Sequence, residues 1–261
     1  MTDITIANEN GGIFTKAYWK RAAKQFSDPK MITIAALIVA LRVVVKLFKI
    51  NIATGLGFSL DGYVNSLGAM IYGPLVGLVG GAISDILGLI ITGQMGSFFP
   101  PFTLVEMASS FIFALFFWNR KITVLRALSA KFSVNLVCNI IMTSVFMKWS
   151  ILIQSGRDAA DAYKIINGVR IAKNLIMFPL EAMIIISVLS FALPILNRLK
   201  LVDKRQCFVD QASKKGLVLK IALLTVLSIA LVVAYILLSE SVDFKFSFKI
   251  SETIFSKWFG Q

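Results

Sequence analysis

Residues 73–92 read GPLVGLVGGAISDILGLIIT, a run in which Asp85 is the single charged residue. Gly73-Pro74 ends the apolar run before it, and residues 75–92 predict a helix about as long as the roughly 30 Å of hydrocarbon in a bilayer. Gly73, Gly77 and Gly81 recur every four residues, so they share one face and allow a neighbouring helix to approach closely. The segment therefore predicts a transmembrane helix that packs inside a helical bundle.

Further apolar runs on both sides extend this pattern along the chain. The predicted spans cover residues 31–50, 58–73, 75–92, 102–118, 130–153, 168–196 and 216–238. The chain has 261 residues, of which 57% are hydrophobic, whereas a soluble domain is nearer half apolar. No cleavable signal peptide is apparent in the polar first thirty residues or so. We therefore predict an all-α, multi-pass membrane protein.

Composition argues against several classes of catalytic site. The sequence contains no histidine and no GxxxxGK[ST] phosphate loop, so it lacks the usual zinc and Ser-His sites and is not itself an ATPase of that class. Cys138 and Cys207 are far apart and fit neither a disulfide framework nor a metal-ligand pattern. We predict a protein that is not an enzyme, with no metal site and no cofactor.

The dense Lys/Arg clusters of this chain, whose net charge is +13, lie in three segments. They are the arm at residues 1–28, the loop at 119–131 and the linker at 198–215, which fall on one side of the membrane if all the spans form. The positive-inside rule places that side, and with it the N-terminus, in the cytoplasm. Loops and anionic lipid explain the charge better than nucleic acid does, because no aromatic-basic module accompanies it.

The N-terminal arm contains a periodic pattern of its own. Phe14, Tyr18, Ala22 and Phe26 recur every four residues, with lysines between them. This spacing predicts an amphipathic helix within residues 13–26 that lies on the membrane surface.

Several basic residues lie inside the predicted spans, where a charge at mid-membrane costs about 2.5–3.5 kcal/mol on insertion scales. Arg42 lies in the first span, and Lys46 follows one turn later on the same face, although Lys46 can also extend to the interface. Arg170 and Lys173 share a face near the outer end of the sixth span, together with Asn174. Counting depth along each span places these side chains together in the outer half of the bundle.

Polar residues elsewhere fall at similar depths. Asn135, Asn139 and Thr143 follow at i, i+4 and i+8 and form one stripe on the fifth span, which also fits hydrogen bonding between helices. Thr103 lies at the start of the fourth span. Asp85 either pairs with a basic residue or accepts from backbone donors, and we interpret its role as structural.

Aromatic residues precede the fourth span. Phe98 and Phe99 lie beside Pro100-Pro101. Arg forks onto carboxylates and Phe stacks on flat rings, so the combination of basic and aromatic side chains predicts a site for an anionic ligand with a flat ring.

Three stretches resemble one known family. Residues 73–88 (GPLVGLVGGAISDILG) and the Ala36-x-x-x-Ala40 pattern are similar to the S components of energy-coupling factor (ECF) vitamin transporters. Residues 40–42 (ALR), 98–104 (FFPPFTL) and 170–181 (RIAKNLIMFPLE) resemble the folate-specific branch. The resemblance covers about residues 31–197.

The resemblance implies a six-helix substrate-binding membrane domain at residues 29–197 of a bacterial cell membrane protein. The 216–238 span is an additional transmembrane helix, and residues 239–261 form a tail. Such a subunit captures folate, or a reduced folate, from the outer face and works with a transmembrane coupling subunit and two ATPases, the coupling subunit packing against Ala36 and Ala40.

Individual roles follow from the same resemblance. Arg42 and Arg170 would pair with the glutamate carboxylates of folate, assisted by Lys173, and Lys46 joins the predicted ligand-binding set. The pterin ring would stack on Phe98 and Phe99. Its polar edges would form hydrogen bonds with Thr103, Asn139, Thr143 and Asn174.

Three other functions remain open from sequence. The same architecture could take another anionic vitamin, such as pantothenate. A self-sufficient secondary transporter would need no ATPase partners, although the internal repeats typical of that class are not apparent. A membrane enzyme is disfavoured because no acid/base pair lies near a nucleophile.

Overall fold

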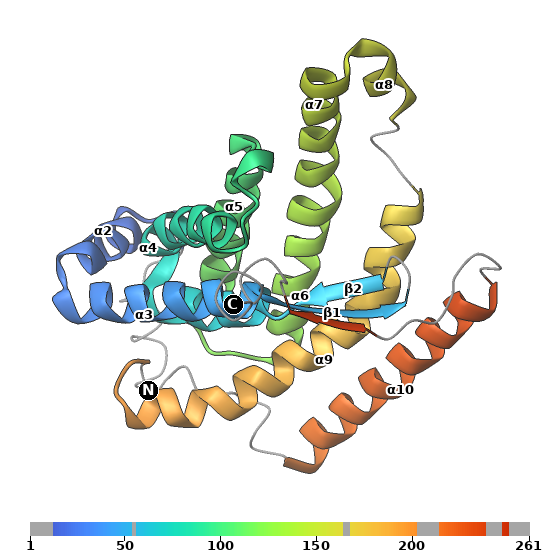
Figure 1. The fold of residues 1–261 in the computed structure, drawn as a ribbon. Helices are drawn as coiled ribbons and strands as arrows, with labels where there is room; N and C mark the ends of the chain where they lie inside the picture. The colour runs from blue at the N-terminus through green and yellow to red at the C-terminus, as the bar shows by residue number, and fades with distance from the viewer. Residues whose placement is uncertain (1–12, 54–55, 164–167, 203–213, 239–246, 251–261) are drawn as a thin grey trace, which may run out of the picture.

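The computed structural model describes residues 13–53, 56–163, 168–202, 214–238 and 247–250. Long helices dominate it (Figure 1). The 1–12 part of the N-terminal arm, most of the 198–215 linker with Cys207, and most of the 239–261 tail lie outside the described residues. The predicted all-α membrane bundle is confirmed, with one small sheet in addition.

The helices of the bundle correspond to the predicted spans. They are α3 (Pro29–Lys46), α4 (Asp61–Ile91), α5 (Pro100–Phe117), the continuous run α6 (Val124–Val134), η3 (Asn135–Met142) and α7 (Thr143–Ser155), and then α9 (Gly168–Arg198). Short helices η2 (Met95–Ser97) and α8 (Arg157–Ala162) lie in the connections. Four of the described helical runs are long and apolar enough to cross a membrane: 61–91, 100–117, 124–155 and 170–198. Three charged residues, Lys30, Arg42 and Lys46, make α3 less apolar than these.

The second and third predicted spans are two helices that join across a sharp kink at Gly73 within α4, and both far ends return to Lys46, which lies near Asp61 and near Asp85. Gly73 has φ 79° and ψ −174°, and Pro74 begins the second half. This backbone conformation is essentially restricted to glycine. A Cβ at Gly73 would also lie 2.7 Å from the Trp118 ring. The kink therefore depends on glycine both for its backbone angles and for the approach of Trp118.

A small antiparallel sheet was not predicted. α3 ends at Lys46, and β1 (Phe48–Ala53) pairs with β2 (Leu56–Ser59) on one side and β3 (Ser247–Ile250) on the other. The register pairs Lys49 with Ser59 and with Lys249. Alternating apolar and polar residues at 48–52 (FKINI) carry the two-residue period of a strand. This hairpin leads directly into α4.

The core lies where α4, α5, α6 and α9 meet. Its fully buried side chains include Phe113 and Phe117 of α5 and Ile185, Ile186 and Leu189 of α9. The additional helix α10 (Lys214–Leu238) packs along α9 (Figure 1). One face of α10 is uncovered by the described residues: its Leu219, Leu223 and Val226 are about two-thirds exposed.

The N-terminal helix α2 (Lys16–Lys24) packs on the bundle. Tyr18 and Ala22 are buried against Trp118, whereas Phe14 is fully exposed and Phe26 is 43% exposed. A short 3₁₀ turn, η1 (Gln25–Ser27), joins α2 to α3. Two of the four residues in the predicted apolar stripe therefore face the protein, and the other two are exposed.

Candidate functional site

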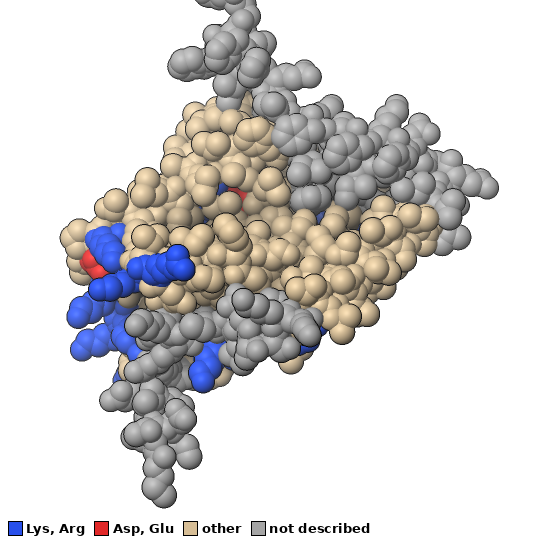
Figure 2. Space-filling model, turned by 90° about the horizontal axis from the view of Figure 1, so that it is seen from below, with Lys and Arg blue, Asp and Glu red and all other residues tan. Residues whose placement is uncertain are grey.

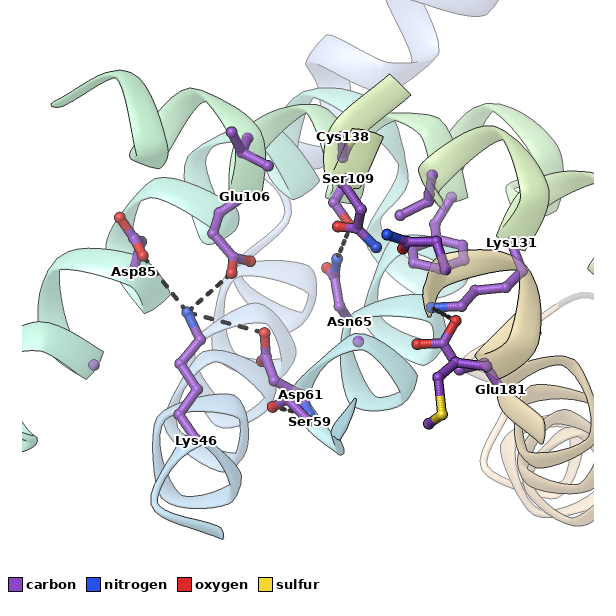
Figure 3. A pocket seen from close by; sticks show the side chains of 18 of the residues that line it. Lys46, Ser59, Asp61, Asn65, Asp85, Glu106, Ser109, Lys131, Cys138 and Glu181 are labelled. Atoms are coloured by element: carbon purple, nitrogen blue, oxygen red, sulfur yellow. Dashed lines mark hydrogen bonds and ion pairs between the residues drawn. The ribbon is translucent and has the colours of Figure 1, made fainter. Parts of the chain in front are cut away.

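A cavity of about 440 Å³ lies between α4, α5, the α6–η3 run and α9. Figure 3 shows two groups of charged side chains in it, with Asn65 of α4 between them. The lining residues are Lys46, Ser59, Asp61, Gly62, Asn65, Asp85, Gly88, Leu89, Thr92, Gln94, Val105, Glu106, Ser109, Phe113, Lys131, Val134, Cys138, Asn139, Lys173, Asn174, Met177 and Glu181. Most come from helices that the sequence predicted, but they converge only in the folded bundle.

The first group, the Lys46 cluster, consists of Lys46, Asp61, Asp85 and Glu106. The Lys46 ammonium Nζ lies 3.5 Å from Glu106 Oε1, 3.8 Å from Asp85 Oδ1 and 3.9 Å from Asp61 Oδ2 (Figure 3). Asp85 also accepts a hydrogen bond of 2.8 Å from Thr103 Oγ1. Lys46 is thus shared among three carboxylates at distances that are longer than a close hydrogen-bonded ion pair.

Arg42 lies behind this cluster and is fully buried. It forks onto Asp61, with Nε donating to Oδ1 at 2.8 Å and Nη2 donating to Oδ2 at 3.1 Å. Nη2 also donates to Glu106 Oε2 at 2.8 Å, and Nη1 donates to Ser110 Oγ at 3.3 Å. Arg42 does not line the cavity, so in this structure it holds the carboxylates that do.

A hydroxyl and amide network continues from Arg42 towards the middle of the cavity. Ser110 Oγ donates to Asn65 Oδ1 at 2.7 Å, and Asn65 Nδ2 donates to Ser109 Oγ at 3.3 Å. These bonds join α4 to α5 and fix the Asn65 amide between the charged groups (Figure 3). Asp61, Asn65 and Asp85 are polar residues of α4 that line the cavity. None of them was among the predicted site residues, although they interrupt apolar spans.

The second group, the Glu181 cluster, consists of Lys131, Asn135, Asn139 and Glu181. Lys131 Nζ lies 3.2 Å from Glu181 Oε2, and Asn135 Nδ2 donates to the same oxygen at 2.9 Å. Asn139 Nδ2 in turn donates to Asn135 Oδ1 at 3.0 Å. The sequence grouped Lys131 with a basic loop, but α6 begins earlier, at Val124, and carries it into the cavity.

The third member of the predicted polar stripe leaves the cavity. Residues 135–142 form a π-helical segment, and Thr143 Oγ1 donates to the carbonyl of Cys138 at 2.7 Å. A π-helix has more residues per turn than an α-helix, so positions i and i+8 no longer share a face. Thr143 does not line the cavity, whereas Asn139 does.

Lys173 and Asn174 of α9 line the other wall. Asn174 Nδ2 donates to the Arg170 carbonyl at 2.9 Å, and Arg170 Nη1 lies 3.4 Å from Ser144 Oγ, outside the lining. Among the described residues, no carboxylate lies within ion-pair distance of Lys173. Lys173 is therefore a half-buried cation that faces the cavity without an ion-pair partner from the described chain.

The predicted aromatic residues stand apart from the lining. Phe99 packs edge-on against Phe102 and Trp149, with ring centroids 5.5 Å and 5.7 Å apart, and Phe98 is 38% exposed. Phe113 of α5 is the phenylalanine that lines the cavity. Of the ten predicted ligand-binding residues, the structure brings four into the lining: Lys46, Asn139, Lys173 and Asn174.

The predicted partner-binding pair has the expected exposure. Ala36 and Ala40 are exposed, whereas Ala35 and Val39 on the same helix are buried. The two small residues therefore lie on a face of α3 that the described residues leave uncovered.

Three comparisons relate this chain to known proteins. Residues 30–193 match the family model described as ECF transporter, substrate-specific component. A folate transporter FolT of Clostridium novyi is 32% identical over 139 residues, which cover 53% of this chain and 73% of the relative. A folate transporter FolT of Leuconostoc mesenteroides is 31% identical over 156 residues, covering 59% of this chain and 81% of the relative. A crystal structure of FolT bound with folic acid has 28% identity and a TM-score of 0.49, covering 59% of this chain and 88% of that chain.

Proposed function

This chain belongs to the family of substrate-specific components of ECF transporters, and from that premise we propose that it captures folate, or a reduced folate, for import. Two relatives that carry the name folate transporter support this choice. The structural observation that carries it is Lys173, which lines a polar cavity without a carboxylate partner among the described residues. A cation in that position favours a ligand that brings its own carboxylate.

The two ends of folate differ chemically, and the cavity differs in a corresponding way. The glutamate end carries carboxylates, which suit Lys173 and the Asn174 amide beside it. The pterin ring presents neighbouring N–H donors, for which the carboxylates of Asp85 and Glu106 are acceptors; these side chains are 15% and 31% exposed. A carboxylate accepts two parallel N–H bonds. We therefore assign the Lys46 cluster to the ring and Lys173 to the glutamate end.

The transport role requires partners that hydrolyse ATP. The family supports an ECF module of one coupling subunit and two ATPases, and we assign the exposed Ala36 and Ala40 of α3 to the contact with the coupling subunit. Small residues let a partner helix approach closely. From the basic arm and loops, we assign the N-terminus to the cytoplasm and the mouth of the cavity to the outer face.

Folate binding is tested by titrating the purified chain with folate and following tryptophan fluorescence. We expect binding at submicromolar concentration, and Lys173→Gln weakens it by about tenfold because one charge-assisted contact is lost. Lys148→Gln is the matched control, since Lys148 pairs with Asp161 away from the cavity. Absence of binding below micromolar folate contradicts the proposed ligand, and an unchanged affinity of Lys173→Gln contradicts the assigned site.

Two further measurements separate the alternatives. Competition by pantothenate and other anionic vitamins distinguishes folate from a different ligand in the same architecture. A pull-down in mild detergent that recovers ATPase subunits supports the ECF module, whereas uptake by the purified chain alone in vesicles identifies a secondary transporter.

A further inference from the structure

Gly88 lies in the last turn of α4, where the backbone is still helical. The Thr92 amide donates to the Gly88 carbonyl at 2.9 Å, and Gly88 itself is buried and lines the cavity. Glycine within a helix is less favourable than alanine, because it loses more backbone freedom on folding. The space around Gly88 shows what the chain gains from the missing side chain.

Lys46 fills the space beside Gly88. A Cβ at position 88 would lie 2.9 Å from Lys46 Cδ, 3.8 Å from Nζ and 3.9 Å from Cε, and these are the nearest described atoms that it would meet. Carbon atoms that are not bonded to each other approach to about 3.5–4.0 Å, so a methyl group at position 88 and the present stem of Lys46 exclude each other. Gly88 thus leaves a notch in α4, and the Lys46 stem lies in it.

The ammonium group at the end of this stem lies in the interior of the bundle. Figure 2 shows basic side chains gathered at the end of the molecule where α2 lies, while most of the other described surface in that view is uncharged. The Lys46 side chain is 16% exposed. Its Nζ lies 3.5 Å, 3.8 Å and 3.9 Å from three carboxylates (Figure 3), whereas close charge-assisted pairs are about 2.7–2.9 Å apart. No single one of the three therefore fixes the ammonium, and the contact of the stem with Gly88 helps to set its position.

Gly81 on the same helix shows a different use of glycine. A Cβ at position 81 would lie 2.9 Å from the Glu106 carbonyl oxygen and 3.0 Å from Met107 Cα, both in the backbone of α5. Such backbone atoms cannot move unless the whole helix moves, whereas the stem of a lysine turns about its own bonds. Gly81 therefore serves the packing of two helices, and Gly88 serves the position of one side chain, Lys46.

We propose that Gly88 is a positioning residue of the ligand site, whose notch keeps the Lys46 ammonium among the three carboxylates of its cluster and keeps the stem out of the cavity. This inference rests on the proposed function, in which the Lys46 cluster receives the ring of the ligand. A methyl group at position 88 pushes the stem away from α4, and the cavity that both residues line is the open space beside it. The displaced side chain then occupies space that the ring needs, and the carboxylates lose their shared cation.

Folate titration of the purified full chain, followed by tryptophan fluorescence, tests the effect on the ligand. Gly88→Ala binds folate about tenfold more weakly, which is the size of one lost charge-assisted contact. Its melting temperature is not lowered, because alanine favours the helix and only the lysine stem has to move. Gly77→Ala is the matched control on the same helix and binds as the wild type does, since Gly77 lies outside the lining and the nearest atom that a Cβ would meet there is 3.5 Å away. Wild-type affinity of Gly88→Ala overturns the proposal, and so does a lowered melting temperature, which places the strain in the helix.

A double-mutant cycle separates positioning from a distortion of α4. In a Lys46→Ala background the added methyl group no longer meets the lysine stem, because all three of the nearest atoms belong to Lys46. Gly88→Ala then changes folate affinity by less than about twofold, which is the size of ordinary non-additivity. The same tenfold loss in both backgrounds, within about twofold, shows that the helix itself is disturbed and overturns the proposal.

Amine labelling of the ligand-free chain reads the position of Lys46 directly. The chain is acetylated briefly in detergent, and the modified lysines are quantified by mass spectrometry. Lys46 is labelled faster in Gly88→Ala than in the wild type, because its ammonium leaves the carboxylates for the cavity, whereas Lys148, which pairs with Asp161 away from the cavity, is labelled equally in both. Equal labelling of Lys46 overturns the proposal. This measurement needs no ligand, so a wild type that binds no folate contradicts the proposed function, and the labelling still decides whether Gly88 positions Lys46.

Discussion

Replacing Arg42 by methionine tests whether this residue supports the fold or contacts the ligand. Methionine retains much of the length and apolar volume of the side chain and removes its charge. The variant leaves Asp61 and Glu106 without their closest cation, because Lys46 Nζ is 3.9 Å and 3.5 Å from them whereas Arg42 contacts both at 2.8 Å. The change therefore leaves the buried Asp61 carboxylate without its closest cation in the bundle.

The expected cost follows from burial. Arg42 is fully buried and the Asp61 side chain is 7% exposed, so water is a poor replacement for the lost partner. Removing one member of such a pair costs about 3–5 kcal/mol, mainly because the other charge stays buried and uncompensated. Arg42→Met/Asp61→Asn removes that stranded charge and recovers part of the loss, with a coupling free energy of up to about 3 kcal/mol.

The assay is reversible unfolding of the ligand-free chain by SDS in mixed micelles, with folate affinity measured on the same preparations. Lys148→Met is the control, because the Lys148–Asp161 pair is 34% and 71% exposed and an exposed pair contributes at most about 1 kcal/mol. A wild-type free energy of unfolding for Arg42→Met, combined with a large loss of folate affinity, refutes the structural role and restores Arg42 as a ligand contact.

Three further perturbations act on separate features of the structure. Gly73→Ala forces a Cβ into the Trp118 ring at a backbone conformation that only glycine adopts readily, and it lowers the free energy of unfolding by about 1–3 kcal/mol; a wild-type value contradicts the kink. Glu181→Gln leaves Lys131 without its carboxylate in the cavity and costs about 1–3 kcal/mol in the same assay, so an unchanged value shows that the pair does not form. Deleting residues 239–261 removes β3 and speeds amide hydrogen exchange in β1, measured by mass spectrometry; unchanged exchange in β1 rules out the β1–β3 pairing.

Much of the fold could be predicted because length and hydropathy act locally. A run of about twenty apolar residues has few alternatives to a transmembrane helix, so the positions of α5, α9 and α10 followed from the sequence. The small sheet did not follow, because β3 is separated from β1 by almost the whole chain and the hairpin strands are short. The alternation at 48–52 is a local signal for β1, but it does not identify β3 as its partner.

The site was predicted only in part, and the reasons are physical. Counting α-helical periods predicted that Asn139 and Thr143 share a face, but the π-helical segment rotates Thr143 out of the cavity. Counting depth brought Lys46 and Lys173 to the same region, which the cavity confirms. Helical periods and depth do not identify ion-pair partners. The sequence therefore did not show that Asp61 and Glu106 pair with Arg42.

Pairing, more than depth, separates structural cations from ligand-facing ones in this bundle. Arg42 and Lys173 both lie within apolar helices, and depth alone assigns both to the ligand. Arg42 is fully buried against two carboxylates, whereas Lys173 lines the cavity with none within ion-pair distance among the described residues. A desolvated cation remains costly until an anion reaches it, so an incoming carboxylate gains most at Lys173 and least at Arg42. Folding should therefore depend on Arg42 and ligand affinity on Lys173, which the two variants measure independently.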